Sequence, residues 1–320
     1  MNSQVWGARK VVIVGAGAVG ATFAYALAQS GISDEIILID QNRDLAQGQV
    51  MDLAHGFPFF PPVEIRAGET DDFADAQVVV ITAGAKQQPG ESRLNLLQRN
   101  ADIAESIVDD VVSRNSRAVI VVVSNPVDVL AQIALKRTEW DRGRVLGSGT
   151  VLDSARLRYL LSKCSGIDVH NVHAYVLGEH GDSEFPAWSL TNIAGMSINE
   201  YCPICAKCGD WKAQRARIVD EVRSSAYHII DYKGATYFAI GLALVRIVGA
   251  VLRNQKTVLT VSTLLTGEYG IDDVCLSVPA VVSQVGVERI VEAELSTEER
   301  ESLSRCALIL RDTLAKLHST

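Results

Sequence analysis

A glycine-rich turn close to the N-terminus constrains the fold of this chain more than any other feature. Gly15, Gly17 and Gly20 follow the β-branched run at residues 10–14 and open an apolar stretch at residues 18–30. A strand that enters such a turn and leaves it as a helix is the context in which this spacing cradles the phosphates of a dinucleotide. The segment therefore predicts the first strand, turn and helix of a parallel α/β sheet.

Each residue of the turn has a distinct physical use. Gly15 permits the tight turn, Gly17 lets the backbone approach a pyrophosphate, and Gly20 lets the helix pack closely on the strand. The helix N-terminus offers free N–H groups and the positive end of its dipole. The backbone between the glycines completes the predicted phosphate site with Ala16, Ala18 and Val19.

An acidic residue ends the second predicted strand, at residues 35–40. Asp40 lies 20 residues after Gly20. A carboxylate at this position accepts hydrogen bonds from the adenosine ribose and repels a 2′-phosphate. We therefore expect NAD, rather than NADP, as the cofactor.

Strand and helix patterns alternate through the first half of the chain. Further β-rich runs lie at residues 77–82 and 118–123, and apolar residues recur at helical spacing from 94 to 111 between them. Apolar strands separated by helices indicate a parallel sheet covered on both faces. We expect a doubly wound Rossmann domain over residues 1–148.

The second half is less regular, and we expect an α+β substrate domain over residues 149–320. Its predicted elements are a helix from about Val151, a strand near 172–176, helices around 212–232 and 236–252, β-rich pieces within 258–282 and a closing helix from about Ser296. Ligands usually bind in the cleft between two such domains.

Charge and hydropathy exclude two classes of function. The net charge is −8 and no dense Lys/Arg block is present, which argues against nucleic acid. The later apolar run at 237–252 is broken by Arg246 and is shorter than the ~20 residues that a bilayer requires. We expect a cytoplasmic protein without a membrane segment.

Three cysteines, Cys202, Cys205 and Cys208, have a spacing that would suit a metal ion or a cluster. A fourth ligand is needed, and no further Cys or His lies close by in the sequence. We interpret the segment as an incidental surface loop and predict no metal; a metal site is the alternative.

Four polar segments stand where packing alone would favour apolar residues. Residues 84–93 and 124–126 each follow a predicted strand, at the edge where α/β sheets bind ligands. Asp153 and Arg156 are three residues apart and share one helix face. Residues 178–182 place a histidine between two glycines. The sequence thus indicates a chemical site built from several strand ends.

Taken together, these segments closely resemble the L-lactate dehydrogenase branch of the lactate/malate dehydrogenase family over essentially the whole chain. The motifs that carry the resemblance are GAGAVG, GAKQQPGESRLNL, VSNPVD, LDSARLR, GEHGDSEFPAWS and KGATYFAIG. The resemblance implies hydride exchange between NADH and pyruvate to give L-lactate, in fermentative glycolysis and in a homotetramer.

The resemblance also implies roles for the polar residues. His180 would be the acid/base, since imidazole titrates near working pH, and Asp153 would stabilise the imidazolium. Arg156 would bind the substrate carboxylate bidentately, and Arg93 would polarise the carbonyl as its loop closes.

Further ligand-binding positions follow from the same resemblance. Asn125 would hydrogen-bond the substrate or the nicotinamide, and Thr236 would line the substrate pocket. The additional residues implied for the cofactor are Thr82, Ala83, Gly84, Ser124 and Ile240.

Gln87, six residues before Arg93, would select the substrate. Malate and oxaloacetate carry a second carboxylate, for which relatives provide an arginine at this position. An uncharged Gln87 would leave that carboxylate unpaired, whereas it tolerates the methyl group of pyruvate. Two alternatives remain: a malate dehydrogenase, which Gln87 disfavours, and a catalytically idle NAD-binding protein, which the retained chemical residues disfavour.

Arg158 and His173 suggest regulation. Resemblance to the allosteric bacterial lactate dehydrogenases implies that they line an anion site between subunits, where fructose 1,6-bisphosphate would favour the active tetramer. The alternative is an exposed arginine and a packed histidine.

Overall fold

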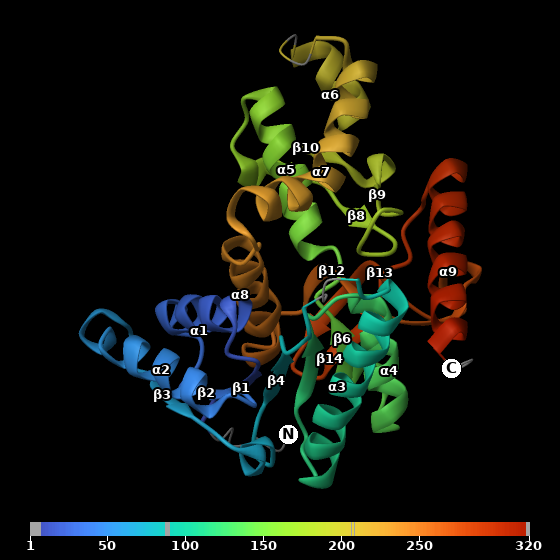
Figure 1. Cartoon of the computed structure of the whole chain (residues 1–320). Helices are drawn as coiled ribbons and strands as arrows, with labels where there is room; N and C mark the ends of the chain where they lie inside the picture. The colour runs from blue at the N-terminus through green and yellow to red at the C-terminus, as the bar shows by residue number, and fades with distance from the viewer. Residues whose placement is uncertain (1–7, 87–89, 206, 208, 318–320) are drawn as a thin grey trace, which may run out of the picture.

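A single large sheet organises the molecule. The computed structural model describes residues 8–86, 90–205, 207 and 209–317. The strands of the main sheet are β1 (Lys10–Val14), β2 (Glu35–Ile39), β3 (Glu64–Ala67), β4 (Val78–Ile81), β5 (Val119–Val122), β6 (Val145–Gly147), β12 (Thr257–Thr266), β13 (Asp272–Ser283) and β14 (Gly286–Ile290). Within the described residues these nine strands run in the order β14-β13-β12-β6-β5-β4-β1-β2-β3. The six from β3 to β6 are parallel, and the other three are antiparallel (Figure 1).

Alternation along the strands creates two separate apolar layers. On β1, Val11 and Ile13 face one cluster, and Val12 and Val14 face the other. The first layer is covered by α1 (Ala18–Ser30), α2 (Arg43–Ala54) and α8 (Phe238–Leu252), and the second by α3 (Arg93–Ser113) and α4 (Val127–Thr138). Strands buried on both faces need apolar residues at every position, which explains the unbroken apolar runs of the sequence.

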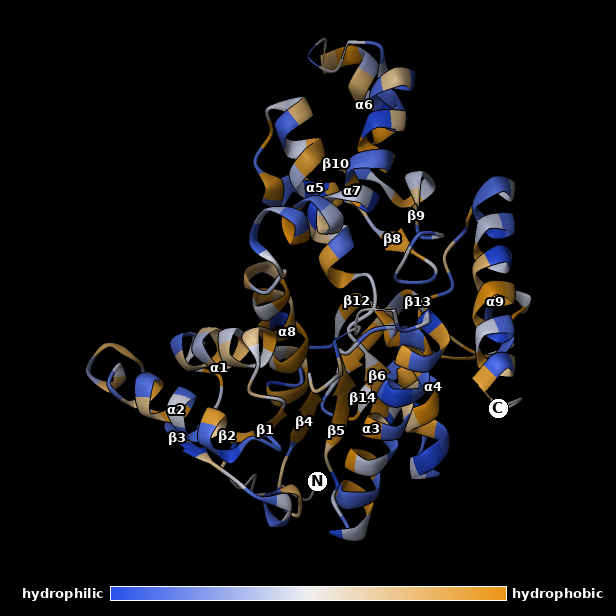
Figure 2. Ribbon diagram, in the orientation of Figure 1, coloured by the Kyte–Doolittle hydropathy of each residue, from blue (hydrophilic) through white to orange (hydrophobic). Residues whose placement is uncertain are grey.

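The hydropathy of the residues in the helices and strands agrees with this layering. Figure 2 shows apolar residues concentrated in the central strands and hydrophilic residues on the outward faces of α3 and α9 (Thr297–Leu317). None of the helices in the described ranges is long and apolar enough to span a membrane.

A second group of elements packs beyond the carboxyl edge of the sheet. It comprises α5 (Val151–Ser165), α6 (Ile198–Cys205), α7 (Trp211–Lys233) and the short strands β7 (Val172–His173), β8 (Val176–Leu177), β9 (Phe185–Pro186), β10 (Asn192–Ile193) and β11 (Met196–Ser197). The helices α5, α6 and α7 share one apolar cluster with β7 and β10, and α9 packs against β13 in another. Figure 1 shows α6 and α7 at the opposite end of the molecule from β1, β2 and β3.

The predicted fold class is confirmed, with three differences of detail. The C-terminal strands β12, β13 and β14 extend the Rossmann sheet, which the sequence did not indicate. The predicted strand at 172–176 is two strands, β7 and β8. The helix α4 was not predicted, because most of its positions are buried and it has no polar stripe to mark a helical period.

The interpretation of the cysteine segment as a surface loop is wrong for Cys202. This residue lies on α6, is 2% exposed and packs in the cluster that contains Ile198, Ile218 and Val222. A buried cysteine behaves as a small apolar side chain. Cys205 ends the same helix and is partly buried, and Cys208 lies outside the described residues.

Gly20 is the point of closest approach between α1 and the glycine turn. A Cβ atom there would lie 1.9 Å from the carbonyl oxygen of Gly15 and 2.8 Å from Oγ1 of Thr82. The nearest obstacle is backbone, so it cannot rotate away. Close packing of this helix on β1 therefore requires glycine.

Gly20→Ala is expected to lower the free energy of unfolding by about 1–3 kcal/mol, because relief of the clash displaces α1. The matched control is Gly48→Ala on α2, where a Cβ would meet nothing within 4 Å. That change should raise stability by about 0.5–1 kcal/mol through helix propensity. Urea unfolding of both variants provides the measurement. Equal stability of Gly20→Ala and the wild type would contradict the packing argument.

Candidate active site

A cavity of about 740 Å³ opens at the carboxyl ends of β1, β2 and β4. Six of its lining residues were predicted from the sequence to bind the cofactor: Gly15, Gly17, Asp40, Thr82, Ala83 and Gly84. Residues of α3, among them Arg99 and Ser106, form part of its wall.

The glycine turn has the shape that a bound pyrophosphate needs. Gly15 has a φ of +106°, which favours glycine, and a Cβ on Gly17 would point into open space. Gly17 is also the N-cap of α1, and no side chain caps the helix there. The first N–H groups of α1 therefore remain available to an anion, as the sequence predicts.

Asp40 has a structural task as well as a binding one. One of its carboxylate oxygens accepts a hydrogen bond from the backbone N–H of Ala16 at 2.7 Å, and the other accepts one from that of Asn42 at 2.8 Å. These bonds fix the carboxylate at the wall of the cavity. A carboxylate fixed there can accept hydrogen bonds from a ribose diol and repels a 2′-phosphate. This wall of the cavity therefore fits NAD.

Other predicted cofactor residues hold the turn in place. The Thr82 hydroxyl donates to the carbonyl oxygen of Gly15 at 2.9 Å, and the Ser124 hydroxyl donates to that of Ala83. The remaining members of the predicted set lie in the first turn of α1 (Ala18, Val19 and Gly20), after β5 (Asn125) and on α8 (Ile240).

His180, Asp153 and Arg156 form one cluster, as their spacing and the family resemblance predict. Nδ1 of His180 lies 2.7 Å from one carboxylate oxygen of Asp153, and Nη1 of Arg156 donates to the other at 2.5 Å. Asp153 is 1% exposed, whereas the imidazole is 26% exposed. The carboxylate is thus enclosed by its two cationic partners, while part of the ring still reaches solvent.

The cluster favours a protonated histidine. Burial by itself would lower the pKa of His180, but the charge and hydrogen bond of Asp153 raise it to about 9. Burial would raise the pKa of Asp153, yet His180 and Arg156 outweigh it and hold that pKa below its usual range. At neutral pH the pair is an imidazolium and a carboxylate beside a guanidinium, which can donate a proton and bind an anion.

Asp128 is a site residue that the sequence analysis missed. It lies in the first turn of α4, is 2% exposed, and accepts a hydrogen bond from the backbone N–H of His180 at 2.8 Å. Burial raises the pKa of Asp128 to about 6. Two bonds of 3.0 Å between Gly178 and Ser277 tie the same turn to β13. Only its place in the VSNPVD motif could have singled Asp128 out.

Glu184 is the second residue that was missed. It immediately precedes β9, and its Oε2 lies 3.9 Å from Nδ1 of His180. Burial, followed by the charge of Asp153, raises the pKa of Glu184 to about 9. An acid next to an apolar strand within the GEHGDSEFPAWS motif was the available signal.

The other predicted substrate residues differ in their exposure. Arg93 is exposed at the start of α3, Asn125 is exposed after β5, and Thr236 is half-buried before α8. A hydrogen bond of 2.8 Å from Tyr227 to Asp182 raises the pKa of Tyr227, and the charge of Arg93 acts in the opposite direction. Arg93 is therefore near this pair. Gln87 lies outside the described residues.

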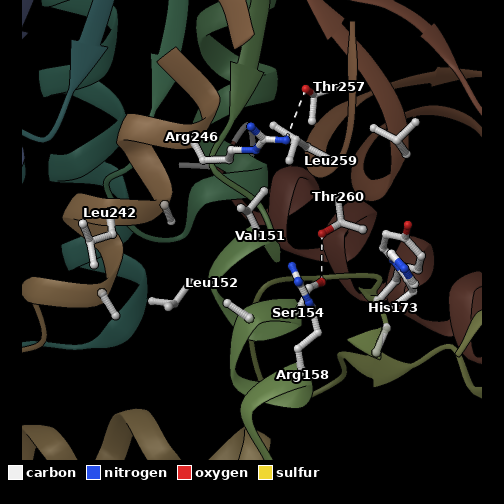
Figure 3. Close-up of a pocket in the computed structure, with 16 residues that line it drawn as sticks. Val151, Leu152, Ser154, Arg158, His173, Leu242, Arg246, Thr257, Leu259 and Thr260 are labelled. Carbon is white, nitrogen blue, oxygen red and sulfur yellow. Dashed lines mark hydrogen bonds between the residues drawn. The ribbon is translucent and has the colours of Figure 1, made fainter. Parts of the chain in front are cut away.

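Arg158 and His173 line a second cavity, of about 540 Å³. The guanidinium of Arg158 donates to the carbonyl oxygens of Val172 at 2.8 Å and Val169 at 3.2 Å. Figure 3 shows these residues with Arg246 of α8, which lies beside Thr257. The side chain of His173 is exposed, so it is not the packed histidine of the alternative interpretation.

Comparison with known families agrees with both halves of the fold. The model of the lactate/malate dehydrogenase NAD-binding domain matches residues 9–147, and that of the family's alpha/beta C-terminal domain matches residues 150–320. The chain belongs to the lactate/malate dehydrogenase family. The predicted family and the predicted NAD cofactor are confirmed.

Individual members of the family are similar over nearly their whole length. The chain is 54% identical to an L-lactate dehydrogenase of Treponema denticola, covering 97% of this chain and 98% of the relative. It is 48% identical to L-lactate dehydrogenase 1 of Clostridium acetobutylicum, covering 95% and 97%.

Solved structures of the family share the architecture. A lactate dehydrogenase from a Medee basin deep-sea metagenome library superposes with a TM-score of 0.94 at 43% identity, covering 97% of this chain and 99% of that one. The minor L-lactate dehydrogenase of Enterococcus mundtii gives 0.93 at 38% identity, covering 96% and 98%.

Within this family fold, the bond from His180 to Asp128 can be tested directly. Asp128→Ala leaves a buried N–H without an acceptor and should cost about 1–3 kcal/mol of unfolding free energy. Asp128→Asn keeps an acceptor oxygen and should cost less. Urea unfolding at pH 7 compares them; equal losses in the two variants would rule out the hydrogen bond as the reason.

Proposed function

We propose that this protein is an NAD-dependent L-lactate dehydrogenase, which interconverts pyruvate and L-lactate. The cluster of His180, Asp153 and Arg156 carries the proposal, since it combines a proton donor with an anion-binding group in a chain of this family. The similar proteins that bear the name L-lactate dehydrogenase support it.

The reaction needs a hydride and a proton on the carbonyl group of pyruvate. NADH, when bound, supplies the hydride to the carbonyl carbon. Nδ1 of His180 faces Asp153, so Nε2 is the ring nitrogen left to donate its proton to the carbonyl oxygen. Asp153 remains ionised and stabilises the imidazolium before the transfer. In lactate oxidation His180 takes the proton back as a base.

Two arginines and three uncharged polar residues would hold the substrate. Arg156 uses one N–H group on Asp153 and keeps further N–H groups for a bidentate pair with the substrate carboxylate. Arg93 would polarise the carbonyl, and Asn125 and Thr236 would complete the pocket. The uncharged Gln87 would accept the methyl group of pyruvate and reject a second carboxylate.

Steady-state kinetics with NADH test this proposal. The kcat/KM for pyruvate should exceed that for oxaloacetate by a factor on the order of 10² or more, since an unpaired desolvated carboxylate costs several kcal/mol. A preference for oxaloacetate would identify a malate dehydrogenase instead. Activity with neither acid would favour an idle NAD-binding protein.

His180→Gln is the control for these assays. It should lower kcat by a factor of roughly 10² to 10⁴ while NADH still binds, because the general acid is lost. Near-normal turnover in this variant would refute the proposed role of the histidine.

We also infer the setting of the enzyme from its resemblance to the allosteric bacterial lactate dehydrogenases. It would work as a cytoplasmic homotetramer that reduces pyruvate in fermentative glycolysis. Each chain would have its domain boundary between residues 148 and 149. Fructose 1,6-bisphosphate would bind at Arg158 and His173. Arg246 lines the same cavity and adds a second guanidinium group for the phosphates.

The activator proposal has its own measurement. Fructose 1,6-bisphosphate at low salt should lower the half-saturating pyruvate concentration about fivefold or more. His173→Gln should lose much of this effect, whereas His170→Gln, which alters an exposed histidine paired with Asp168, should keep it. An unchanged half-saturation in the wild type would exclude activation.

A further inference from the structure

Glu184 places a second carboxyl group beside the His180–Asp153 pair. Its side chain is 4% exposed, and its Oε2 is buried with no hydrogen-bond partner among the described residues, 3.9 Å from Nδ1 of His180. Arg223 of α7 approaches it, but the guanidinium donates to the backbone carbonyl oxygen of Glu184, at 2.6 and 3.0 Å. Oε2 of Glu184 therefore lies farther from the imidazole than the carboxylate of Asp153 does, at 3.9 Å against 2.7 Å.

The surrounding charges disfavour a second anion at this place. One ligand atom each of Asp153, His180 and Glu184 lies within 4.8 Å of the others. Asp153 already neutralises the imidazolium and is ionised by its contacts with both His180 and Arg156. A second buried carboxylate so close to the first is repelled by it and is not hydrated.

We propose that Glu184 is a positioning residue that carries a proton in the working enzyme, so that Asp153 is the single ionised carboxylate in contact with the imidazole of His180. This inference rests on the proposed function for its kinetic consequences only. The groups that face Glu184 are His180 from its own turn, Asp153 and Arg156 from α5, and Arg223 from α7. Asp128 of α4 contacts the same histidine through the backbone N–H of that histidine.

Within the cluster of His180, Arg156 and Asp153, a neutral Glu184 leaves one net positive charge for the substrate. His180 and Arg156 carry two positive charges and Asp153 carries one negative charge. The carboxylate of pyruvate balances the remainder. Ionisation of Glu184 would cancel the positive charge before the substrate arrives, so pyruvate would bind less well. Both His180 and Glu184 must then be protonated for efficient capture and reduction of pyruvate.

Glu184→Gln isolates this effect, because the amide has the shape of the acid but cannot ionise. At pH 7 its kcat/KM for pyruvate should stay within about threefold of the wild type. At high pH, log kcat/KM of the wild type should fall with a slope approaching about −2, because two protons are required. In the variant the slope should be about −1. Parallel profiles, or a loss beyond about 100-fold at pH 7 in a folded variant that binds NADH, would overturn the proposal.

The matched control is Glu299→Gln on α9. Glu299 is also buried, but it accepts hydrogen bonds from the backbone N–H groups of Ser189 at 3.0 Å and Ser296 at 2.9 Å. Its carboxyl group is thus satisfied by hydrogen bonds, unlike Oε2 of Glu184. The variant should retain the wild-type slope.

A direct measurement removes the dependence on catalysis. The infrared difference spectrum between wild type and Glu184→Gln at pH 7 should contain the carbonyl stretching band of one protonated carboxylic acid. Absence of this band overturns the proposal even if pyruvate is reduced, and its presence supports the proposal even if another substrate is used. Should the glutamine variant fail to fold, Glu184→Met, which is neutral and of similar length, provides the same difference spectrum.

Discussion

The buried carboxylate of Asp153 contacts two of the cationic groups that the proposed chemistry uses. One of its oxygens faces the imidazole of His180 and the other accepts from Arg156. Because α5 brings Asp153 and Arg156 to the same face, a single helix holds the anion-binding group beside the carboxylate that contacts the proton donor. The protonation state of the histidine and the orientation of its free nitrogen both follow from this one contact.

The remaining positions of the site depend on contacts between the two halves of the chain. Asp128 belongs to a helix of the Rossmann half and holds the backbone of His180, which belongs to the other half. The two backbone hydrogen bonds between Gly178 and Ser277 attach the turn that contains His180 to β13 as well. The cofactor edge of the sheet and the histidine turn are thereby aligned by hydrogen bonds that span 52 and 99 residues of sequence.

Local features of the structure could be predicted from the sequence, and long-range ones could not. The glycine turn, its strand and helix, and the shared face of Asp153 and Arg156 are determined over a few residues, so their patterns were sufficient. Asp128 and Glu184 acquire their significance only from a histidine that the fold brings next to them. The continuation of the sheet from β6 into β12 likewise joins segments more than 100 residues apart, for which periodicity contains no information.

The continuous sheet also restricts how the molecule can move. Gly147 at the end of the Rossmann half pairs with Ser262 of β12, and β12 and β13 pair over almost their full lengths. A rotation of one half against the other would separate β6 from β12, so the two halves are not free to swing as rigid bodies about a linker. Access to the space between the nicotinamide and substrate positions must be controlled by the segments that border it. Because one sheet runs through both halves of the chain, the two halves should unfold together as one cooperative unit.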